Sequence, residues 1–108
     1  MPTYNKLVRD RIPEIIQKTG KNFRRDVLDA RTYEKELKVK LQEEVEELLR
    51  ASTKEELVEE MADLMEVVYA LGQYAGVEPS EIERVREDKL ANRGGFKERI
   101  FLIDVEDD

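Results

Sequence analysis

The sequence predicts an all-α fold built around an antiparallel pair of long helices. Apolar residues recur every three or four positions from about residue 30 to residue 75, and Ser52 and Thr53 interrupt this pattern once. Because so few residues separate the two helices, we expect them to lie side by side. The length of 108 residues indicates one domain over residues 1–108, with four to five helices in total.

A short helix is expected ahead of this pair. Arg11 and Ile12 precede Pro13, and proline is well tolerated in the first turn of a helix. Gly20 then ends the helix. The following residues, 23–28, form either a short extended segment or a plain loop, and the sequence leaves both readings open.

The first long helix is expected to begin at a cap, either Asp29 or Thr32, and to continue to about Arg50. Its apolar side is formed by Leu37, Leu41, Val45, Leu48 and Leu49. These positions are spaced three or four residues apart, so they share one face of a helix that packs on a partner.

The second long helix is expected to start at Ser52, which forms the capping-box pattern with Glu55. It runs to about Tyr74 or Ala75, and Gly76 stops it. Its apolar side is formed by Leu57, Met61, Leu64, Met65, Val68 and Leu71.

A last helix and a β-prone segment complete the chain. The helix begins at Pro79 and is closed by Gly94 and Gly95. The run Ile-Phe-Leu-Ile at 100–103 favours a strand. We therefore expect one or two short β segments, near residues 23–28 and 98–105, which could pair with each other.

The composition restricts the chemistry. A net charge of −7 disfavours binding to a nucleic-acid polymer. The chain has no Cys and no His, which excludes disulfides, thiolate ligands, a cysteine nucleophile and a histidine base. Any metal must therefore be held by oxygen, as Mg²⁺, Mn²⁺ or Ca²⁺ prefers. Neither a membrane-spanning run nor a signal peptide is visible, so a cytoplasmic protein is expected.

One acidic phrase occurs twice, sixteen residues apart, as Leu-x-x-Glu-x-x-acid-Leu at 41–48 and at 57–64. The first copy carries Glu44 and Glu47, and the second carries Glu60 and Asp63. Acids three apart lie one turn apart on the same side of a helix. If the two helices pack together, four carboxylates can converge, and such a cluster needs a cation to relieve its repulsion. The alternative is that these acids only form a solvated face in a chain with 26 acids.

Two basic groups could hold phosphate. Lys89, Asn92 and Arg93 precede Gly94 and Gly95, and exposed glycine N–H groups can assist cations in binding an anion. The alternative is an ordinary helix end, where cations favour the dipole. Lys6 and Arg9 form a second group, which could reach a phosphate or simply pair with the acidic surface.

Three segments together resemble a known superfamily. Glu43-Glu44-x-x-Glu47 followed by Glu60-x-x-Asp63 is similar to the EExxE…ExxD signature of the all-α, MazG-like nucleoside triphosphate pyrophosphatases. The opening from Tyr4 to Ile16 resembles a house-cleaning branch related to phosphoribosyl-ATP pyrophosphohydrolase, and Arg93 to Phe96 fits a later motif of that branch.

This resemblance implies a magnesium-dependent enzyme, with Mn²⁺ as a possible substitute. It implies metal ligands at Glu44, Glu47, Glu60 and Asp63, with Glu43 in support. A carboxylate less committed to metal, Glu43 or Glu47, would accept a proton from the attacking water. Lys89, Asn92 and Arg93 would contact phosphates, and Lys6 and Arg9 are further candidates.

The implied reaction cleaves the α–β phosphate bond of a nucleoside or deoxynucleoside triphosphate, expected to be a modified one, giving a monophosphate and pyrophosphate. The resemblance also implies a homodimer or homotetramer. Two alternatives stay open: hydrolysis of phosphoribosyl-ATP, and a non-catalytic helical interaction module whose acids only form a surface.

Overall fold

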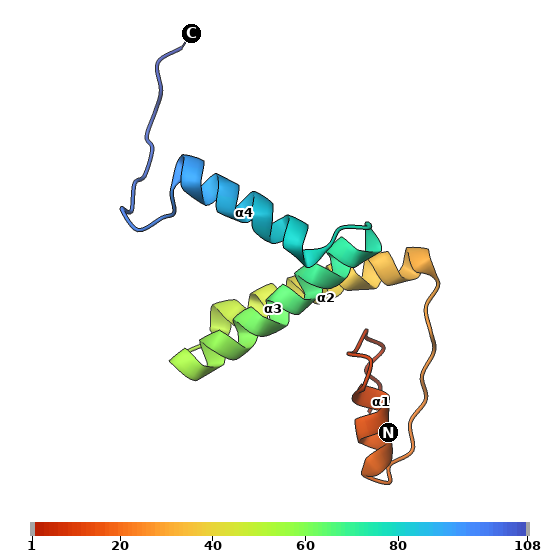
Figure 1. The fold of residues 1–108 in the computed structure, drawn as a ribbon. Helices are drawn as coiled ribbons and strands as arrows, with labels where there is room; N and C mark the ends of the chain where they lie inside the picture. The colour runs from red at the N-terminus through yellow and green to blue at the C-terminus, as the bar shows by residue number, and fades with distance from the viewer. Residues whose placement is uncertain (1, 108) are drawn as a thin grey trace.

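Four helices form the regular structure of residues 2–107, the part of the chain that the computed structural model describes (Figure 1). They are α1 (Ile12–Lys18), α2 (Ala30–Arg50), α3 (Lys54–Tyr74) and α4 (Pro79–Arg93). The two longest, α2 and α3, pack against each other as an antiparallel hairpin. The predicted all-α fold and its central helix pair are therefore confirmed. None of the four helices combines the length and the apolar character that a bilayer span requires.

Side-chain caps fix where α2 and α3 begin. The Oδ1 atom of Asp29 accepts a hydrogen bond of 2.8 Å from the N–H of Thr32, as predicted for the start of α2. At the start of α3, Thr53 Oγ1 accepts from the N–H of Glu56 at 3.1 Å, and Glu56 Oε2 accepts from the N–H of Ser52 at 3.0 Å. The predicted box of Ser52 with Glu55 is thus wrong by one residue, because Thr53 is the last extended residue before the helix.

The core of the hairpin is thin. Leu37 on α2 and Val67 on α3 are the two hydrophobic residues that the described chain buries. Tyr33 and Tyr74 meet edge to face, with ring centroids 6.0 Å apart, where the start of α2 lies beside the end of α3. A core this small implies that much of the apolar surface remains available for other contacts.

A glycine allows α4 to approach α3 closely. A Cβ atom at Gly72 would lie 3.2 Å from Cδ1 of Ile82, so a larger side chain there would crowd the side chain of Ile82. Gly76 has φ of +81°, the left-handed conformation that ends α3 and turns the chain toward α4. From this contact α4 leads away from the hairpin (Figure 1).

The predicted β segments do not form in residues 2–107. Residues 23–28 belong to the irregular connection between α1 and α2, and residues 98–105 lie in the irregular chain beyond α4 (Figure 1). A strand needs a neighbour to accept and donate its backbone hydrogen bonds. Apart from the local turn bond between the N–H of Arg99 and the carbonyl of Phe96, neither segment finds a backbone partner in the described chain, so β-prone residues alone do not produce a sheet.

A candidate metal centre on the helix hairpin

Three carboxylates from two helices meet on one side of the hairpin. Glu44 and Glu47 lie one turn apart on α2, and Glu60 lies on α3. One oxygen from each of the three side chains can be chosen so that all lie within 4.8 Å of one another. Antiparallel packing places the second half of α2 beside the first half of α3, and the repeated acidic phrase therefore presents its acids to one place.

Two oxygens of this cluster are buried without a partner. Glu44 is only 6 % exposed, and it is the single charged residue that the described chain buries. Its Oε2 atom and the Oε2 atom of Glu60 lack any hydrogen-bond donor. Burying an ionised carboxylate without a partner costs roughly several kcal/mol of free energy. A cation bound between these oxygens would remove that cost.

The pKa values of the buried Glu44 and the half-buried Glu60 report the same crowding. Burial raises the pKa of Glu44, and the charge of Glu47 raises it further, while Lys40 opposes this change. Burial also raises the pKa of Glu60, followed in importance by a hydrogen bond to Glu47 and by the charge of that residue. Both carboxyls therefore favour the protonated form more than an ordinary glutamate does.

The cluster fits a small divalent cation. Mg²⁺ takes oxygen ligands at about 2.0–2.1 Å, so ligands on opposite sides of the ion lie about 4 Å apart. The three carboxylate oxygens lie at most 4.8 Å from one another. Small side-chain rotations can bring them to the separation that Mg²⁺ requires. The orphaned oxygens of Glu44 and Glu60 supply the donor atoms.

The N-terminal cations contact the two predicted site acids outside this triad. Arg9 Nη2 lies 2.6 Å from Asp63 Oδ1, and Lys6 Nζ lies 3.9 Å from Glu43 Oε1. Asp63 remains close enough for its charge to raise the pKa of Glu44. Of the two readings of Lys6 and Arg9 from the sequence, the structure shows the pairing with acids.

Lys40 is a site residue that the sequence reasoning missed. Its Nζ atom lies 3.5 Å from Glu43 Oε1 and 3.6 Å from Glu44 Oε1. The spacing of three and four residues on one helix is the signal that could have identified it. Lys40 places a positive charge at the edge of the cluster and partly offsets the repulsion there.

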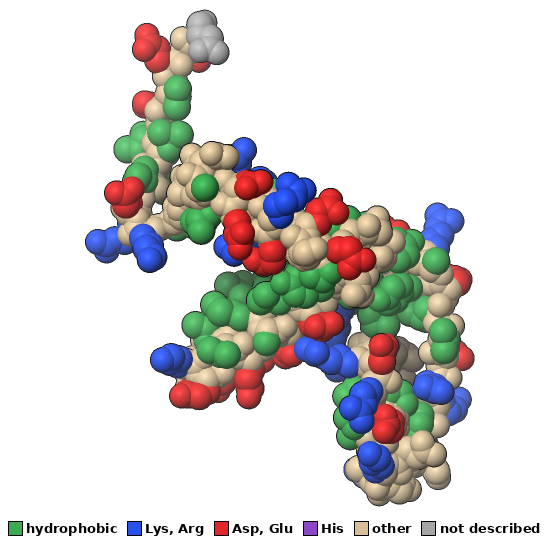
Figure 2. All heavy atoms as spheres, in the orientation of Figure 1, with side chains coloured by type: hydrophobic (Ala, Val, Ile, Leu, Met, Phe, Trp, Pro, Cys, Tyr) green, Lys and Arg blue, Asp and Glu red, His purple; other side chains and the backbone are tan. Residues whose placement is uncertain are grey.

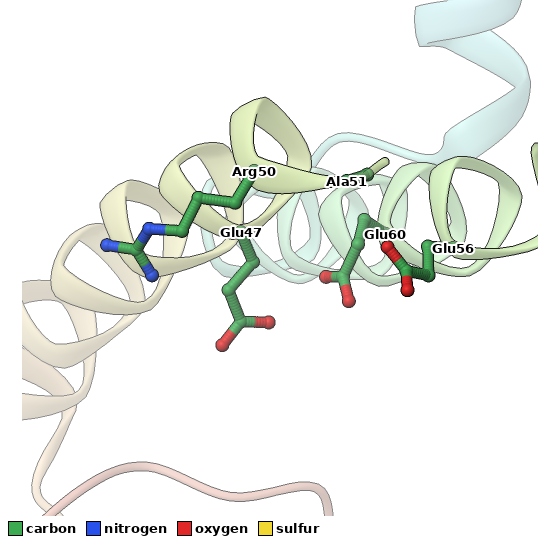
Figure 3. Close-up of a pocket in the computed structure, with 5 residues that line it drawn as sticks. All are labelled: Glu47, Arg50, Ala51, Glu56 and Glu60. Carbon is green, nitrogen blue, oxygen red and sulfur yellow. The ribbon is translucent and has the colours of Figure 1, made fainter. Parts of the chain in front are cut away.

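A cavity of about 190 Å³ adjoins the acids and is lined by Glu47, Arg50, Ala51, Glu56 and Glu60. Figure 3 shows the carboxylates of Glu47, Glu56 and Glu60 on the same side of the hairpin. The Arg50 side chain points away from them. The cluster is thus open to solvent on one side, where a phosphate group could approach.

The predicted phosphate contacts at the end of α4 are not brought to the acids within one chain. Lys89, Asn92 and Arg93 are exposed on a helix that leads away from the hairpin (Figure 1). No ion pair or hydrogen bond joins them to the acids in residues 2–107. Their contact with phosphate stays a prediction.

Comparison with known proteins gives one match. A family model described as phosphoribosyl-ATP pyrophosphohydrolase matches residues 4–89, which is most of the chain. The matched stretch includes the acids of both helices, Lys40 and the N-terminal cations, and it ends at Lys89. Neither the curated proteins nor the solved structures gave a match.

Proposed function

The chain belongs to the phosphoribosyl-ATP pyrophosphohydrolase family, and on this premise we propose that it hydrolyses the α–β phosphate bond of a nucleoside triphosphate with Mg²⁺. The family consists of pyrophosphohydrolases, enzymes that act on acid anhydrides, within the MazG-like all-α superfamily. The products would be the nucleoside monophosphate and pyrophosphate. The observation that carries the proposal is the convergence of Glu44, Glu47 and Glu60 with two orphaned oxygens.

Four acids would hold the metal ion: Glu44, Glu47, Glu60 and Asp63. Mn²⁺ could replace Mg²⁺ at an oxygen-only site of this kind. A bound divalent cation supplies positive charge against the phosphate oxygens and makes water more acidic. Asp63 joins this set only after Arg9 releases it, so we expect metal and Arg9 to compete for the same oxygen.

A carboxylate that is not fully committed to the metal would take the proton of the attacking water. Glu43 fits this role, because it lies on α2 next to the triad but pairs with Lys6 and Lys40 and does not join the metal-binding acids. Glu47 is the second candidate, since it is half-buried and lies at the mouth of the cavity. Either acid needs only to lie within hydrogen-bond reach of the water.

Cations of this chain would bind the phosphates. Lys6 pairs with Glu43 and Arg9 pairs with Asp63. When a nucleotide arrives with its metal, its phosphates can replace these two acids as the partners of Lys6 and Arg9. Lys89, Asn92 and Arg93 would contribute from a neighbouring copy, because α4 carries them away from the acids of its own chain.

Two substrate classes share the proposed bond. A standard or modified nucleoside triphosphate is the first, and phosphoribosyl-ATP is the second, which the description of the matched family favours. Both present an α–β anhydride to the same cluster, and therefore one site could serve either. A non-catalytic interaction module would not require buried, unpaired carboxylates to converge.

The molecule would act as a homodimer or homotetramer. One chain exposes 10,245 Å² of surface, whereas a compact protein of 12.7 kDa exposes about 6,200 Å². Its radius of gyration of 18.7 Å likewise exceeds the value of about 13 Å for a compact chain of this length. Self-association would cover this excess.

The test is a pyrophosphate-release assay over phosphoribosyl-ATP and a panel of standard and damaged triphosphates, with and without Mg²⁺. We expect metal-dependent release from at least one of them. Glu44→Ala and Asp63→Ala should each lower turnover more than about 100-fold while keeping the helical circular dichroism spectrum. Glu59→Ala, an exposed acid next to the site, is the matched control. Full turnover in the Glu44 and Asp63 variants would refute the assignment.

A further inference from the structure

The C-terminal arm, defined as residues 96–105, is an apolar segment that touches little of its own chain. Six of its residues are large and hydrophobic, and each is at least 72 % exposed: Phe96, Ile100, Phe101, Leu102, Ile103 and Val105. A contiguous apolar run in water is unfavourable unless another surface covers it. Figure 2 shows hydrophobic side chains along the C-terminal end of the chain, away from the helix hairpin.

A defined turn directs the arm away from the hairpin. Gly94 has φ of +78° at the end of α4, and Arg99 has φ of +58°, a conformation that non-glycine residues rarely adopt. The N–H of Arg99 donates to the carbonyl of Phe96 at 3.1 Å and closes the turn. Because the turn has its own hydrogen bond and backbone conformation, the direction of the arm follows from the local structure.

A matching apolar surface runs along α3. The α3 stripe, defined as Leu57, Met61, Met65 and Val68, lies on one face, and its members are between 38 and 49 % exposed. At about 1.5 Å per residue the stripe is about 17 Å long. The run from Ile100 to Val105, at about 3.3 Å per residue, is also about 17 Å long. The two surfaces therefore agree in length and in chemistry.

The exposed area points to a second copy as the partner. The chain exposes about 4,000 Å² more than a compact protein of its mass. Permanent homodimers bury about 2,000–5,000 Å² in total. Two arms and two stripes, which a two-fold axis would pair with each other, account for an interface of that kind.

We propose that the C-terminal arm leaves its own chain and covers the α3 stripe of a second copy, which returns its own arm in exchange. This inference rests on the self-association in the proposed function, and it names the segment that produces it. An exchanged arm also explains why β-prone residues at 100–103 stay extended without a partner in one chain.

Cysteine cross-linking tests where the arm lies, since the natural chain has no cysteine. An Ile103→Cys variant is mixed with a Met65→Cys variant, the assemblies are exchanged in mild urea, and the mixture is oxidised. We expect a disulfide that joins one molecule of each variant. Replacing the second partner with a Val27→Cys variant, exposed in the α1–α2 connection, is the control and should give little of this product.

The doubly substituted chain Ile103→Cys with Met65→Cys supplies the decisive contrast. Cross-linking between chains supports the exchange, whereas a disulfide within one chain would show that the arm folds back on its own α3 and would overturn the proposal. An absence of cross-linking in an assembled protein would overturn it as well.

A charge variant measures the contribution of the arm to assembly. Phe101→Glu combined with Ile103→Glu should lower the mass in light scattering toward that of one chain, 12.7 kDa, while Val27→Glu leaves the mass unchanged. An unchanged mass in the arm variant would contradict the exchange. Calorimetry with Mn²⁺ separates this result from a failure of the proposed function, because the metal-binding acids all lie within one hairpin.

Discussion

Arg9 and Asp63 form the shortest ion pair of the described residues, with Nη2 and Oδ1 2.6 Å apart across 54 positions of sequence. The pair ties the segment before α1 to α3. It also occupies an acid that the proposed metal site requires. The guanidinium of Arg9 therefore neutralises part of the negative charge that a bound metal ion would otherwise neutralise.

Replacing Arg9 should separate its two roles. An Arg9→Gln variant is expected to bind Mn²⁺ up to about fivefold more tightly without nucleotide, since a half-exposed ion pair contributes about 1 kcal/mol at most. The same variant should show a higher KM, because the guanidinium no longer meets the phosphates. Calorimetry and initial rates measure the two effects. Arg11→Gln is the control, because Arg11 pairs with the nearby Glu14 and not with the acid cluster. Equal behaviour of the two variants would show that Arg9 has no role in the site.

Local signals in the sequence predicted the helices well. Asp29 caps α2, Pro79 begins α4, and the spacing of leucines defines the seam, because each of these effects acts within a few residues. The strands failed for the opposite reason. Whether residues 98–105 pair depends on a partner that lies elsewhere, and propensity alone carries no information about it.

The site shows the same division between local and distant effects. The repeated phrase predicted that four carboxylates would converge. Glu44, Glu47 and Glu60 do so, whereas Asp63 pairs with Arg9 instead. The partner of Asp63 could not be chosen from sequence, since a cation near the N-terminus can pair with many of the 26 acids. The burial of Glu44 also emerged only from packing, because the helix pattern places that residue at the border of the apolar stripe.

The pH dependence of stability should reveal the buried charge of Glu44. Its pKa is raised in the folded state, so the favourable contribution of the protonated form is present below pH 4.5 and is lost as pH rises through the raised pKa. Glu44→Gln cannot ionise and avoids this loss. Without metal, the variant should therefore unfold at higher urea than the natural chain at pH 7, and at nearly the same urea at pH 4. A gap of the same size at both pH values would show that ionisation of Glu44 is not the cause, and Glu59→Gln serves as the control.

A divalent metal ion should offset the free-energy cost of ionising Glu44 in the folded hairpin. A divalent ion binds the ionised carboxylates of the folded hairpin, so Mn²⁺ at about 100 times its Kd at pH 7 should add about 2.7 kcal/mol to the free energy of unfolding at that pH. The gain should grow from pH 5 to pH 7, because Glu44 and Glu60 must release their protons first. Thermal unfolding with and without Mn²⁺ measures it. In Glu60→Gln the gain should nearly vanish, and an undiminished gain there would place the ion elsewhere.

Lys40 should stabilise the metal-free hairpin more than an ordinary surface lysine does. Its side chain is 19 % exposed, and its ammonium lies within 4 Å of both Glu43 and Glu44, whose charges otherwise repel each other. Lys40→Met should lower the free energy of unfolding at pH 7 by about 1 kcal/mol. Lys38→Met removes a comparable but more exposed pair with Glu34 and should cost less. Mg²⁺ should raise the stability of the Lys40 variant more than that of the Lys38 variant, because the ion takes over the charge that Lys40 supplied. If magnesium affected both variants equally, Lys40 would act only as a surface charge.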